Sequence, residues 1–344
     1  MRFESIAPLL LGALVGCGSP QSDGPRSASN ATSSASETTS LTTRAPPPGP
    51  SVSVVAAFDP ASGELPEGVA TKDGYAYVGF APTGEVAKVD LRTGERSKFA
   101  SLPRPVANKG FMTGLAFGPD GALYAALVSF DPSVQPGVYR VGQAGGDAAL
   151  FAKDPKMVFP NGLVFDGRGD LFVTDSAAGT IFKANRKGAV TTWVSGAVLE
   201  GDPAQCGGSG NPFAIGANGL VEREGAFFAT NTDKGSVVRI DVRSDGAAAT
   251  PTIAAGPDCA ALSGADGLAV DARGDFVVAV NRQNKVVRIA RGGAVETIAA
   301  GSPVEFPASI AWNGPAMITT SFALANAATG KPAKPALLRI ATGR

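Results

Sequence analysis

A polar residue followed by glycine recurs five times in this chain, at intervals of about 50 residues, each time just before a short apolar run. The pairs are Glu67-Gly68, Thr113-Gly114, Asn161-Gly162, Asn218-Gly219 and Asp266-Gly267. A period in this range with strand-like content is typical of solenoids and propellers. The sequence therefore predicts a fold built from repeated small sheets around one axis.

Each repeat contains four short apolar segments separated by turn residues, for example 162–165, 171–175, 180–184 and 190–194 in the third. A sixth unit runs from Ser309 to Ile340 and ends one strand short. The segment Val52–Phe58, ahead of the first repeat, has the character of the missing outer strand. We therefore predict an all-β fold over 51–344, a six-bladed β-propeller whose last blade receives its outer strand from the N-terminal strand.

Asn-Gly and Asp-Gly are also ordinary hairpin-turn signals, so the pairs have a second interpretation. Other residues, such as Asp120-Gly121, already supply the turn to the second strand of a repeat. We therefore expect the pairs to open the innermost strands, where glycine permits close approach of neighbouring backbones.

Composition excludes several classes of function. The 30 Lys and Arg balance the 30 Asp and Glu, so no basic footprint favours nucleic acid. The chain contains no histidine, which excludes a Ser-His-Asp triad and His-ligated zinc. Any acid–base or metal chemistry must come from carboxylates, amides, hydroxyls, Lys, Tyr or Cys.

The N-terminus has the features of a targeting segment. Arg2 is followed by the apolar stretch Ile6–Val15, too short to span a bilayer, which ends in a lipobox-like Leu14-Val15-Gly16-Cys17. We expect a lipoprotein signal peptide over 1–16, lipidation of Cys17 and a disordered Ser/Thr/Pro-rich tether over 17–50. This predicts an exported bacterial lipoprotein anchored in a membrane, at the outer membrane or cell surface; an ordinary cleavable signal is the alternative.

Two further cysteines, Cys206 and Cys259, precede Asn218 and Asp266 in the loops that enter adjacent repeats. Export places them in an oxidising compartment, so we predict a disulfide between them. Two unpaired buried thiols are the alternative.

The starts of inner strands share one face of a propeller, so four oxygen-bearing side chains are expected to converge. They are Glu67, Asn161, Asn218 and Asp266. Two carboxylates and two amide oxygens match the hard-oxygen preference of Ca²⁺, although another divalent cation, such as Mg²⁺, is compatible with them. Four protein ligands leave positions open for water and substrate, which favours a catalytic ion.

Second strands run antiparallel to the first, so their ends return to the same face. Asp175, Asn231 and Asn281 occupy those ends, and Thr113 takes the leading position in the second repeat. We predict that these four orient the metal ligands or contact substrate, with plain strand-end capping as the alternative. Six phenylalanines near predicted loops could form an apolar wall or pack in the core: Phe80, Phe111, Phe130, Phe159, Phe213 and Phe322.

This ordered set resembles the SMP-30/gluconolactonase/LRE-like propellers, which are related to calcium-dependent phosphotriesterases, diisopropyl-fluorophosphatase and paraoxonases. The resemblance covers about 51–341 and implies a calcium held by Glu67, Asn161, Asn218 and Asp266. It further implies catalytic roles for Asp266, by direct attack or by activating water, and for Glu67, by holding the metal. Met112-Thr113-Gly114 departs from the Arg and Asn-Asp-Gly cluster of the gluconolactonase branch, which puts sugar-lactone recognition in doubt.

We therefore expect a monomeric calcium-dependent hydrolase of small lactones, esters or phosphotriesters, with no nucleic-acid partner and no membrane contact beyond the lipid anchor. A non-enzymatic surface-tethered propeller, with a structural calcium and a binding or scaffold role, is the main alternative. A lyase or another enzyme class on a related propeller is a further one.

Overall fold

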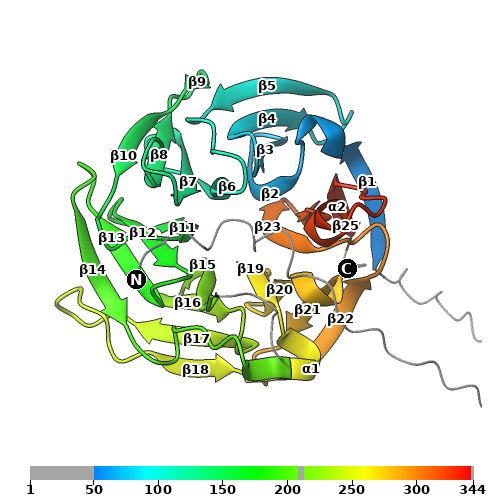
Figure 1. Ribbon diagram of the computed structural model, residues 1–344. Coiled ribbons are helices and arrows are strands. Elements are labelled where there is room, and N and C mark those ends of the chain that lie inside the picture. The colour runs from blue at the N-terminus through cyan, green and yellow to red at the C-terminus, as the bar shows by residue number, and fades with distance from the viewer. Residues whose placement is uncertain (1–49, 208–212, 342–344) are drawn as a thin grey trace, which may run out of the picture.

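The computed structural model describes residues 50–207 and 213–341. The predicted signal peptide, Cys17 and all but the last residue of the predicted tether lie outside these ranges. Within them the strands form six antiparallel sheets set around one axis, which confirms the predicted six-bladed propeller (Figure 1). None of the helices in these ranges is long and apolar enough to cross a membrane.

The blades follow one another along the chain, each numbered from its innermost strand outwards. Blade 1 consists of β2 (Pro66–Lys72), β3 (Tyr75–Phe80), β4 (Glu85–Asp90) and β5 (Arg96–Ser101). Blade 2 consists of β6 (Gly110–Phe117), β7 (Leu123–Ser129), β8 (Gly137–Val141) and β10 (Ala149–Ala152). Blade 3 consists of β11 (Pro160–Phe165), β12 (Leu171–Asp175), β13 (Thr180–Ala184) and β14 (Val190–Ser195).

Blades 4 to 6 continue the pattern. Blade 4 consists of β15 (Ala217–Arg223), β16 (Ala226–Asn231), β17 (Ser236–Asp241) and β18 (Thr252–Ala255). Blade 5 consists of β19 (Ala265–Val270), β20 (Phe276–Val280), β21 (Lys285–Ile289) and β22 (Val295–Ala300). Blade 6 consists of β23 (Pro307–Asn313), β24 (Ala316–Ser321), β25 (Ala336–Ala341) and β1 (Ser51–Ala57). The short helices are η3 (Pro60–Ser62), η4 (Gln205–Gly207), α1 (Cys259–Leu262), η5 (Asn281–Gln283) and α2 (Leu324–Ala328).

The N-terminal strand closes the ring as predicted. β1 pairs antiparallel with β25, with Val52 opposite Ile340, and becomes the outermost strand of blade 6 (Figure 1). Without β1 the outer edge of β25 would present unpaired backbone groups, so this pairing removes an exposed edge.

Apolar clusters between neighbouring blades hold the ring together. Val86 of blade 1 packs with Met112 and Leu127 of blade 2, and the same pattern continues round to Val78 of blade 1 with Ile318 of blade 6. Because strand side chains alternate between the two faces of a sheet, each blade offers an apolar face to both neighbours. The core is therefore a ring of clusters.

The glycine of each pair lies against the backbone of the next blade. A Cβ on Gly68 would lie 2.3 Å from the Thr113 carbonyl oxygen, and one on Gly219 would lie 2.4 Å from that of Asp266. These distances are too short for any side chain. The pairs therefore open inner strands, as predicted, and do not serve as hairpin turns.

One feature departs from the regular four-stranded blade. The two-residue strand β9 (Gly146–Asp147) of the second repeat pairs in parallel with β5 of blade 1. Ala148 then donates a backbone hydrogen bond to Ser101 at 2.8 Å. The predicted turn between the third and fourth strands of this repeat therefore also covers the edge of the neighbouring blade.

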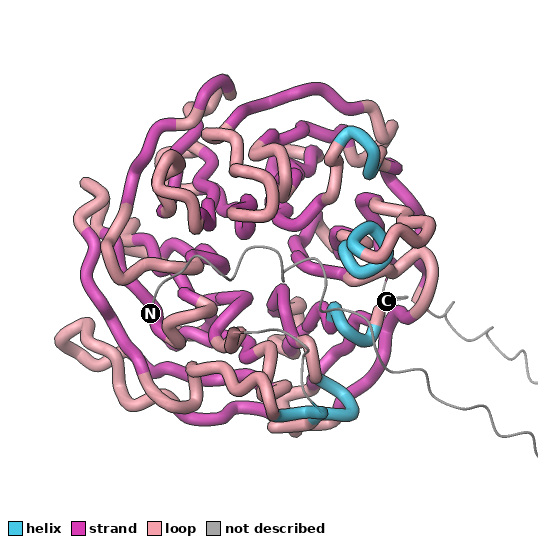
Figure 2. The backbone as a smooth tube through the Cα atoms, viewed as in Figure 1, coloured by secondary structure: helices cyan, strands magenta, loops and turns pink. Residues whose placement is uncertain are grey.

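The two ends of the propeller axis differ in how the strands are joined. At the upper end, where the inner strands begin, a long segment such as 322–335 connects strands. At the lower end, where the inner strands end, the connections to the second strands are short turns such as 73–74 and 224–225. Figure 2 shows the loops and short helices that join the strands around the ring. Longer loops give the upper end more residues with which to build a site.

Candidate metal centre

The four predicted donors each occupy the second position of an inner strand. Glu67 lies in β2, Asn161 in β11, Asn218 in β15 and Asp266 in β19. Their exposed fractions lie between 5% and 7%. Four polar side chains are therefore buried at the same end of the same ring.

Contacts between blades bring these residues together. A Cβ on Gly162 would meet the Asn218 carbonyl oxygen, and one on Gly219 would meet that of Asp266, so blades 3, 4 and 5 adjoin at these positions. The Asn218 side chain lowers the pKa of Asp266, and the charge of Asp266 raises that of Glu67. The carboxylates of blades 1 and 5 thus share one interior region.

Burial makes negative charge costly at this place. Loss of hydration, followed by the charge of Asp266, raises the pKa of Glu67 well above its usual range. Burial also raises the pKa of Asp266 to about 7, although hydrogen bonds from Asn281 and Asn218 and the charge of Arg282 act in the opposite direction. Two buried acids that resist ionisation form a region that a cation would stabilise.

The two amides are held by hydroxyl groups of their own blades. Asn161 Nδ2 donates to Ser176 Oγ at 3.2 Å, and Asn218 Nδ2 donates to Thr232 Oγ1 at 3.0 Å. Asn218 Oδ1 is buried and has no hydrogen-bond partner. An unpaired buried acceptor beside two carboxylates is what an oxygen-liganded cation site requires, so the donor set fits Ca²⁺ or a similar hard ion.

The set contains only two carboxylates. Across the part of the chain that the structure describes, no three His, Cys, Asp or Glu side chains cluster as a metal site. Half of the donors in the candidate centre are therefore neutral amides, whose affinity for cations depends on how their oxygens are oriented.

Asn281 lies beside the donors as predicted. Its Nδ2 donates to Asp266 Oδ2 at 2.8 Å, and the side chain is buried. Arg282 follows and forms an ion pair of 2.8 Å with the fully buried Asp233, whose other oxygen accepts from the Ile215 N–H. The Asp266 carboxylate is thus oriented from its own blade and lies near a fixed positive charge.

Asp175 and Asn231 are placed differently from the prediction. The Asp175 carboxylate accepts hydrogen bonds from backbone N–H groups, at 2.6 Å from Val158 and 2.8 Å from Phe159, and Asn231 Nδ2 donates to the Val198 and Glu200 carbonyls. Both side chains brace loops, and no hydrogen bond described for them reaches the four donors.

The reason lies in the strand register. Asp175 pairs with Pro160 and Asn231 with Ala217, the residues just before the donors, whereas Val280 holds that place in blade 5. The position that contacts the donor comes one residue later. This position is occupied by Ser176, Thr232 and Asn281. For Ser176 and Thr232, the signal in the sequence was a hydroxyl side chain directly after the end of the second strand.

Thr113 contacts backbone. Its hydroxyl donates to the Pro160 carbonyl of the next blade at 2.8 Å, and the residue is fully buried. It fills the leading position of blade 2 and joins two blades there, with no hydrogen bond to a donor side chain described.

The predicted disulfide is present. Cys206 in η4 and Cys259 in α1 are bonded, with their Cα atoms 5.0 Å apart. The bridge ties together the loops that lead into β15 and β19, the strands that carry Asn218 and Asp266.

The six phenylalanines considered for an apolar wall are described by their packing contacts. Phe111, Phe159 and Phe213 make a chain with ring centroids 5.2 and 6.3 Å apart. Phe80 instead packs edge-on against Phe58 in the core between blades 6 and 1. The remaining two lie in separate surroundings, Phe322 packed with Phe306 and Phe130 in a pocket of about 450 Å³.

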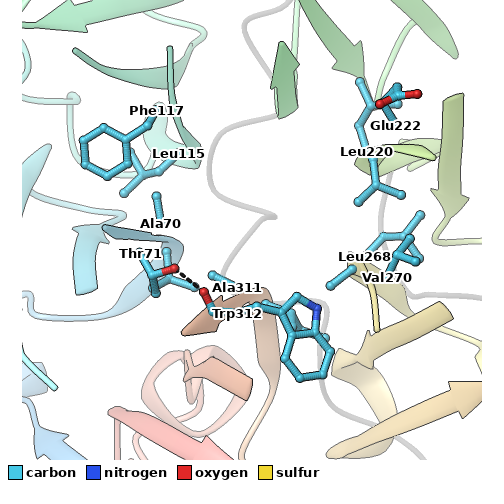
Figure 3. Close-up of a pocket in the computed structure, with 14 residues that line it drawn as sticks. Ala70, Thr71, Leu115, Phe117, Leu220, Glu222, Leu268, Val270, Ala311 and Trp312 are labelled. Atoms are coloured by element: carbon cyan, nitrogen blue, oxygen red, sulfur yellow. Dashed lines mark hydrogen bonds between the residues drawn. The ribbon is translucent and has the colours of Figure 1, made fainter. Parts of the chain in front are cut away.

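A cavity of about 400 Å³ occupies the lower end of the axis (Figure 3). Its lining comes from later positions of the inner strands, among them Leu115, Leu220 and Leu268, with Trp312 beside them (Figure 3). Thr71 donates to the Trp312 carbonyl at 2.6 Å and links blades 1 and 6 there. The four donors do not line this cavity, so the two ends of the axis are chemically distinct.

The fold and this site define a class: six-bladed propellers with a ring of buried oxygen donors at the starts of the inner strands. Residues 214–322 match the family described as the SMP-30/Gluconolactonase/LRE-like region, which confirms the resemblance read from the sequence. The matched segment contains Asn218 and Asp266, two of the four donors. No curated protein sequence matches the chain.

Solved structures share the architecture at low sequence identity. The calcium-binding protein regucalcin from Agrobacterium tumefaciens is 18% identical, with a TM-score of 0.58 over 87% of this chain and 96% of that one. A luciferin-regenerating enzyme is 14% identical, with a TM-score of 0.58 over 85% and 95%. Virginiamycin B lyase from Staphylococcus aureus is 14% identical, with a TM-score of 0.51 over 78% and 80%. At these identities the likeness establishes the fold.

Proposed function

We propose that this protein is a calcium-dependent hydrolase of lactones, esters or phosphotriesters. The observation that carries the proposal is the pair of buried carboxylates, Glu67 and Asp266, beside the unpaired amide oxygen of Asn218. Support comes from the related family, in which gluconolactonase is named, and from the calcium-binding neighbour regucalcin.

In this proposal Glu67, Asn161, Asn218 and Asp266 hold the ion. A bound Ca²⁺ supplies positive charge for the substrate's carbonyl or phosphoryl oxygen as negative charge develops on it. Asn281 fixes the rotamer of the Asp266 carboxylate through its 2.8 Å hydrogen bond. Asp266 would then act in one of two ways. It attacks the carbonyl carbon or phosphorus and displaces the alcohol or phenol as its oxyanion, and water hydrolyses the covalent intermediate; or it accepts a proton from a water molecule that makes the same displacement.

A substrate panel tests the activity. We expect the purified protein to turn over a lactone, an aryl ester or a phosphotriester in the presence of Ca²⁺ and to lose that turnover with chelator. Multiple turnover in ¹⁸O-water separates the two roles of Asp266. Direct attack, followed by hydrolysis of the covalent intermediate at the Asp266 carboxyl carbon, places label in that side chain, whereas water activation labels only the product. Absence of calcium-dependent turnover across the whole panel would contradict the proposal.

A structural calcium in a binding or scaffold propeller is the second candidate. One observation favours it: the cavity of about 400 Å³ on the axis lies at the opposite end from the donors. Asp266→Asn separates the two candidates when tested at calcium concentrations that saturate the variant. Loss of turnover in a folded, Ca²⁺-saturated variant supports the hydrolase, whereas Ca²⁺ binding that raises the melting temperature of an unmodified protein without turnover on any substrate of the panel supports the scaffold.

We further propose that the protein is an exported, lipid-anchored monomer that acts on a small molecule. The basis is the segment from Arg2 to Cys17 and the balanced charge of the chain. Metabolic labelling with palmitate should be lost in Cys17→Ala, and sedimentation of the protein without its anchor should give a monomer mass.

A further inference from the structure

Two hydroxyl groups occupy the same place in neighbouring blades at the upper end. Ser176 follows β12 and Thr232 follows β16, and both are buried, with exposed fractions of 0% and 2%. Each contacts a donor of its own blade and also the backbone of the next blade. This double contact sets them apart from the other buried hydroxyls.

The contact with the next blade fixes where the hydroxyl proton goes. Ser176 Oγ donates to the Ala217 carbonyl at 2.8 Å, and Thr232 Oγ1 donates to the Ala265 carbonyl at 2.7 Å. A carbonyl oxygen can only accept, and a hydroxyl has one proton, so that proton is committed to the backbone. Towards the donor amide each hydroxyl oxygen can then act only as an acceptor.

This commitment fixes the orientation of both amides. The atom that Asn161 and Asn218 turn towards the hydroxyl must be Nδ2, at 3.2 and 3.0 Å. The oxygen of each amide is therefore turned away from the hydroxyl, and Asn218 Oδ1 has no partner. Without the hydroxyl, an Asn amide can rotate by half a turn and exchange its oxygen for its nitrogen.

We propose that Ser176 and Thr232 are positioning residues that keep the amide oxygens of Asn161 and Asn218 available to a hard divalent cation. The inference rests on the metal centre of the proposed function. The carbonyls of Ala217 and Ala265 belong to the next blade in each case. The affinity of the centre for the cation therefore also depends on how neighbouring blades are aligned.

Titration of the full chain with Ca²⁺ alone, by isothermal titration calorimetry, tests this proposal. We expect Thr232→Val and Ser176→Ala to weaken Ca²⁺ binding about 10- to 100-fold, the usual effect of removing a group that orients a metal ligand. Thr232→Ser and Ser176→Thr keep the hydroxyl and should restore affinity to within about threefold of the unmodified protein.

Thr319→Val is the matched control. Thr319 is also fully buried, and its hydroxyl donates to the Ser309 carbonyl at 2.8 Å, but no contact with a donor side chain is described for it. This variant loses one buried hydroxyl–backbone hydrogen bond and should bind Ca²⁺ as the unmodified protein does. Circular dichroism establishes that each variant is folded, and Ser176→Ala carries the test alone if Thr232→Val is not.

The outcomes separate this inference from the proposed function. Unchanged Ca²⁺ affinity in both Thr232→Val and Ser176→Ala would overturn the positioning role and leave the metal centre standing. Equal weakening in Thr319→Val would overturn it as well, by assigning the effect to general stability. An unmodified protein that binds neither Ca²⁺ nor Mg²⁺ would overturn both. Selective weakening with recovery by the conservative variants supports the inference.

Discussion

The upper and lower ends of the propeller axis are built by the same inner strands and yet have opposite character. At the upper end Glu67 and Asp266 are buried with raised pKa values, and the Asn281 amide donates to the Asp266 carboxylate. At the lower end Leu115, Leu220 and Leu268 line a cavity (Figure 3). Two or three residues along one strand separate the two environments.

The comparison shows how stability and chemistry divide along the axis. The leucines of the lower end also belong to the clusters between blades, so they contribute to the free energy of folding. The buried acids of the upper end oppose folding unless a cation or a proton neutralises them. The candidate metal centre therefore lies where burial of polar groups costs the most stability.

The largest expected effect on Ca²⁺ affinity comes from removing charge at the upper end, and the effects on folding stability follow in decreasing order. Asp266→Asn or Glu67→Gln should weaken Ca²⁺ binding more than 100-fold, about 2.8 kcal/mol, because each removes half of the negative charge of the donor set. The same substitutions should raise the melting temperature of the metal-free protein, since a buried charge is lost. Calorimetric titration and thermal melts measure both.

Glu222→Gln is the control for that prediction. Glu222 lines the lower cavity and is part of β15, the same strand as Asn218. Its replacement should leave Ca²⁺ affinity unchanged. An equal loss in Glu222→Gln would contradict the assignment of the metal centre to the upper end.

Backbone contact between blades gives the second effect. Gly219→Ala places a Cβ 2.4 Å from the Asp266 carbonyl oxygen and 2.6 Å from the Leu268 nitrogen, both backbone atoms of β19, so the two blades must move apart. We expect a loss of about 4 kcal/mol in the free energy of unfolding, together with weaker Ca²⁺ binding. Urea denaturation with and without Ca²⁺ measures it.

Gly167→Ala is matched to this change. Gly167 lies in a turn at the lower end, and a Cβ there meets no atom within 4 Å. Its stability should change by less than about 1 kcal/mol. Similar losses in the two variants would show that the close approach at the upper end is not what makes glycine necessary.

The metal-free protein should lose stability as pH rises. Unfolded Asp and Glu titrate near 4, whereas burial raises the pKa of Asp266 to about 7 and that of Glu67 in the same direction. Between these values the folded state binds more protons than the unfolded state, so the free energy of unfolding falls with rising pH. The expected fall is about 3 kcal/mol between pH 4 and pH 7.

A comparison of the unmodified protein with Asp266→Asn separates the contribution of Asp266 to this pH dependence from the contributions of the other acids. The variant should show a smaller fall over the same pH range, and saturating Ca²⁺ should remove much of the fall in the unmodified protein. An identical pH dependence of the free energy of unfolding in the two proteins would contradict a raised pKa for Asp266 in the folded state.

The disulfide gives the smallest effect. It joins positions 53 residues apart and ties two upper-end loops, whereas lower-end turns are closed by backbone hydrogen bonds such as that from Gly169 to Asp166. Cys206→Ser with Cys259→Ser should lower the free energy of unfolding by about 2 kcal/mol, because the unfolded chain gains freedom. The same loss on reduction of the unmodified protein is the internal check in the melts.

The repeat pattern was sufficient to predict the number of blades, the closing strand and the four donors as one group. It was not sufficient for the residues that support the donors. Asp175 and Asn231 have suitable side chains at strand ends, but register places them on loop backbone, and Ser176 and Thr232 take the neighbouring position. A shift of one residue along a strand turns the side chain to the other face.

The amino-acid sequence by itself determined the propeller and the candidate donor residues. Both follow from local features that recur with a fixed period: apolar runs, glycines and an oxygen-bearing side chain at the start of five inner strands. Only the tertiary structure decided which hydroxyls hold the donor amides, that Asp233 holds Arg282, and that the open cavity lies at the lower end. These depend on register and on contacts between residues 30 or more positions apart, such as Thr232 with Ala265. Such contacts cannot be predicted from any short stretch of sequence, because the fold brings the two residues together.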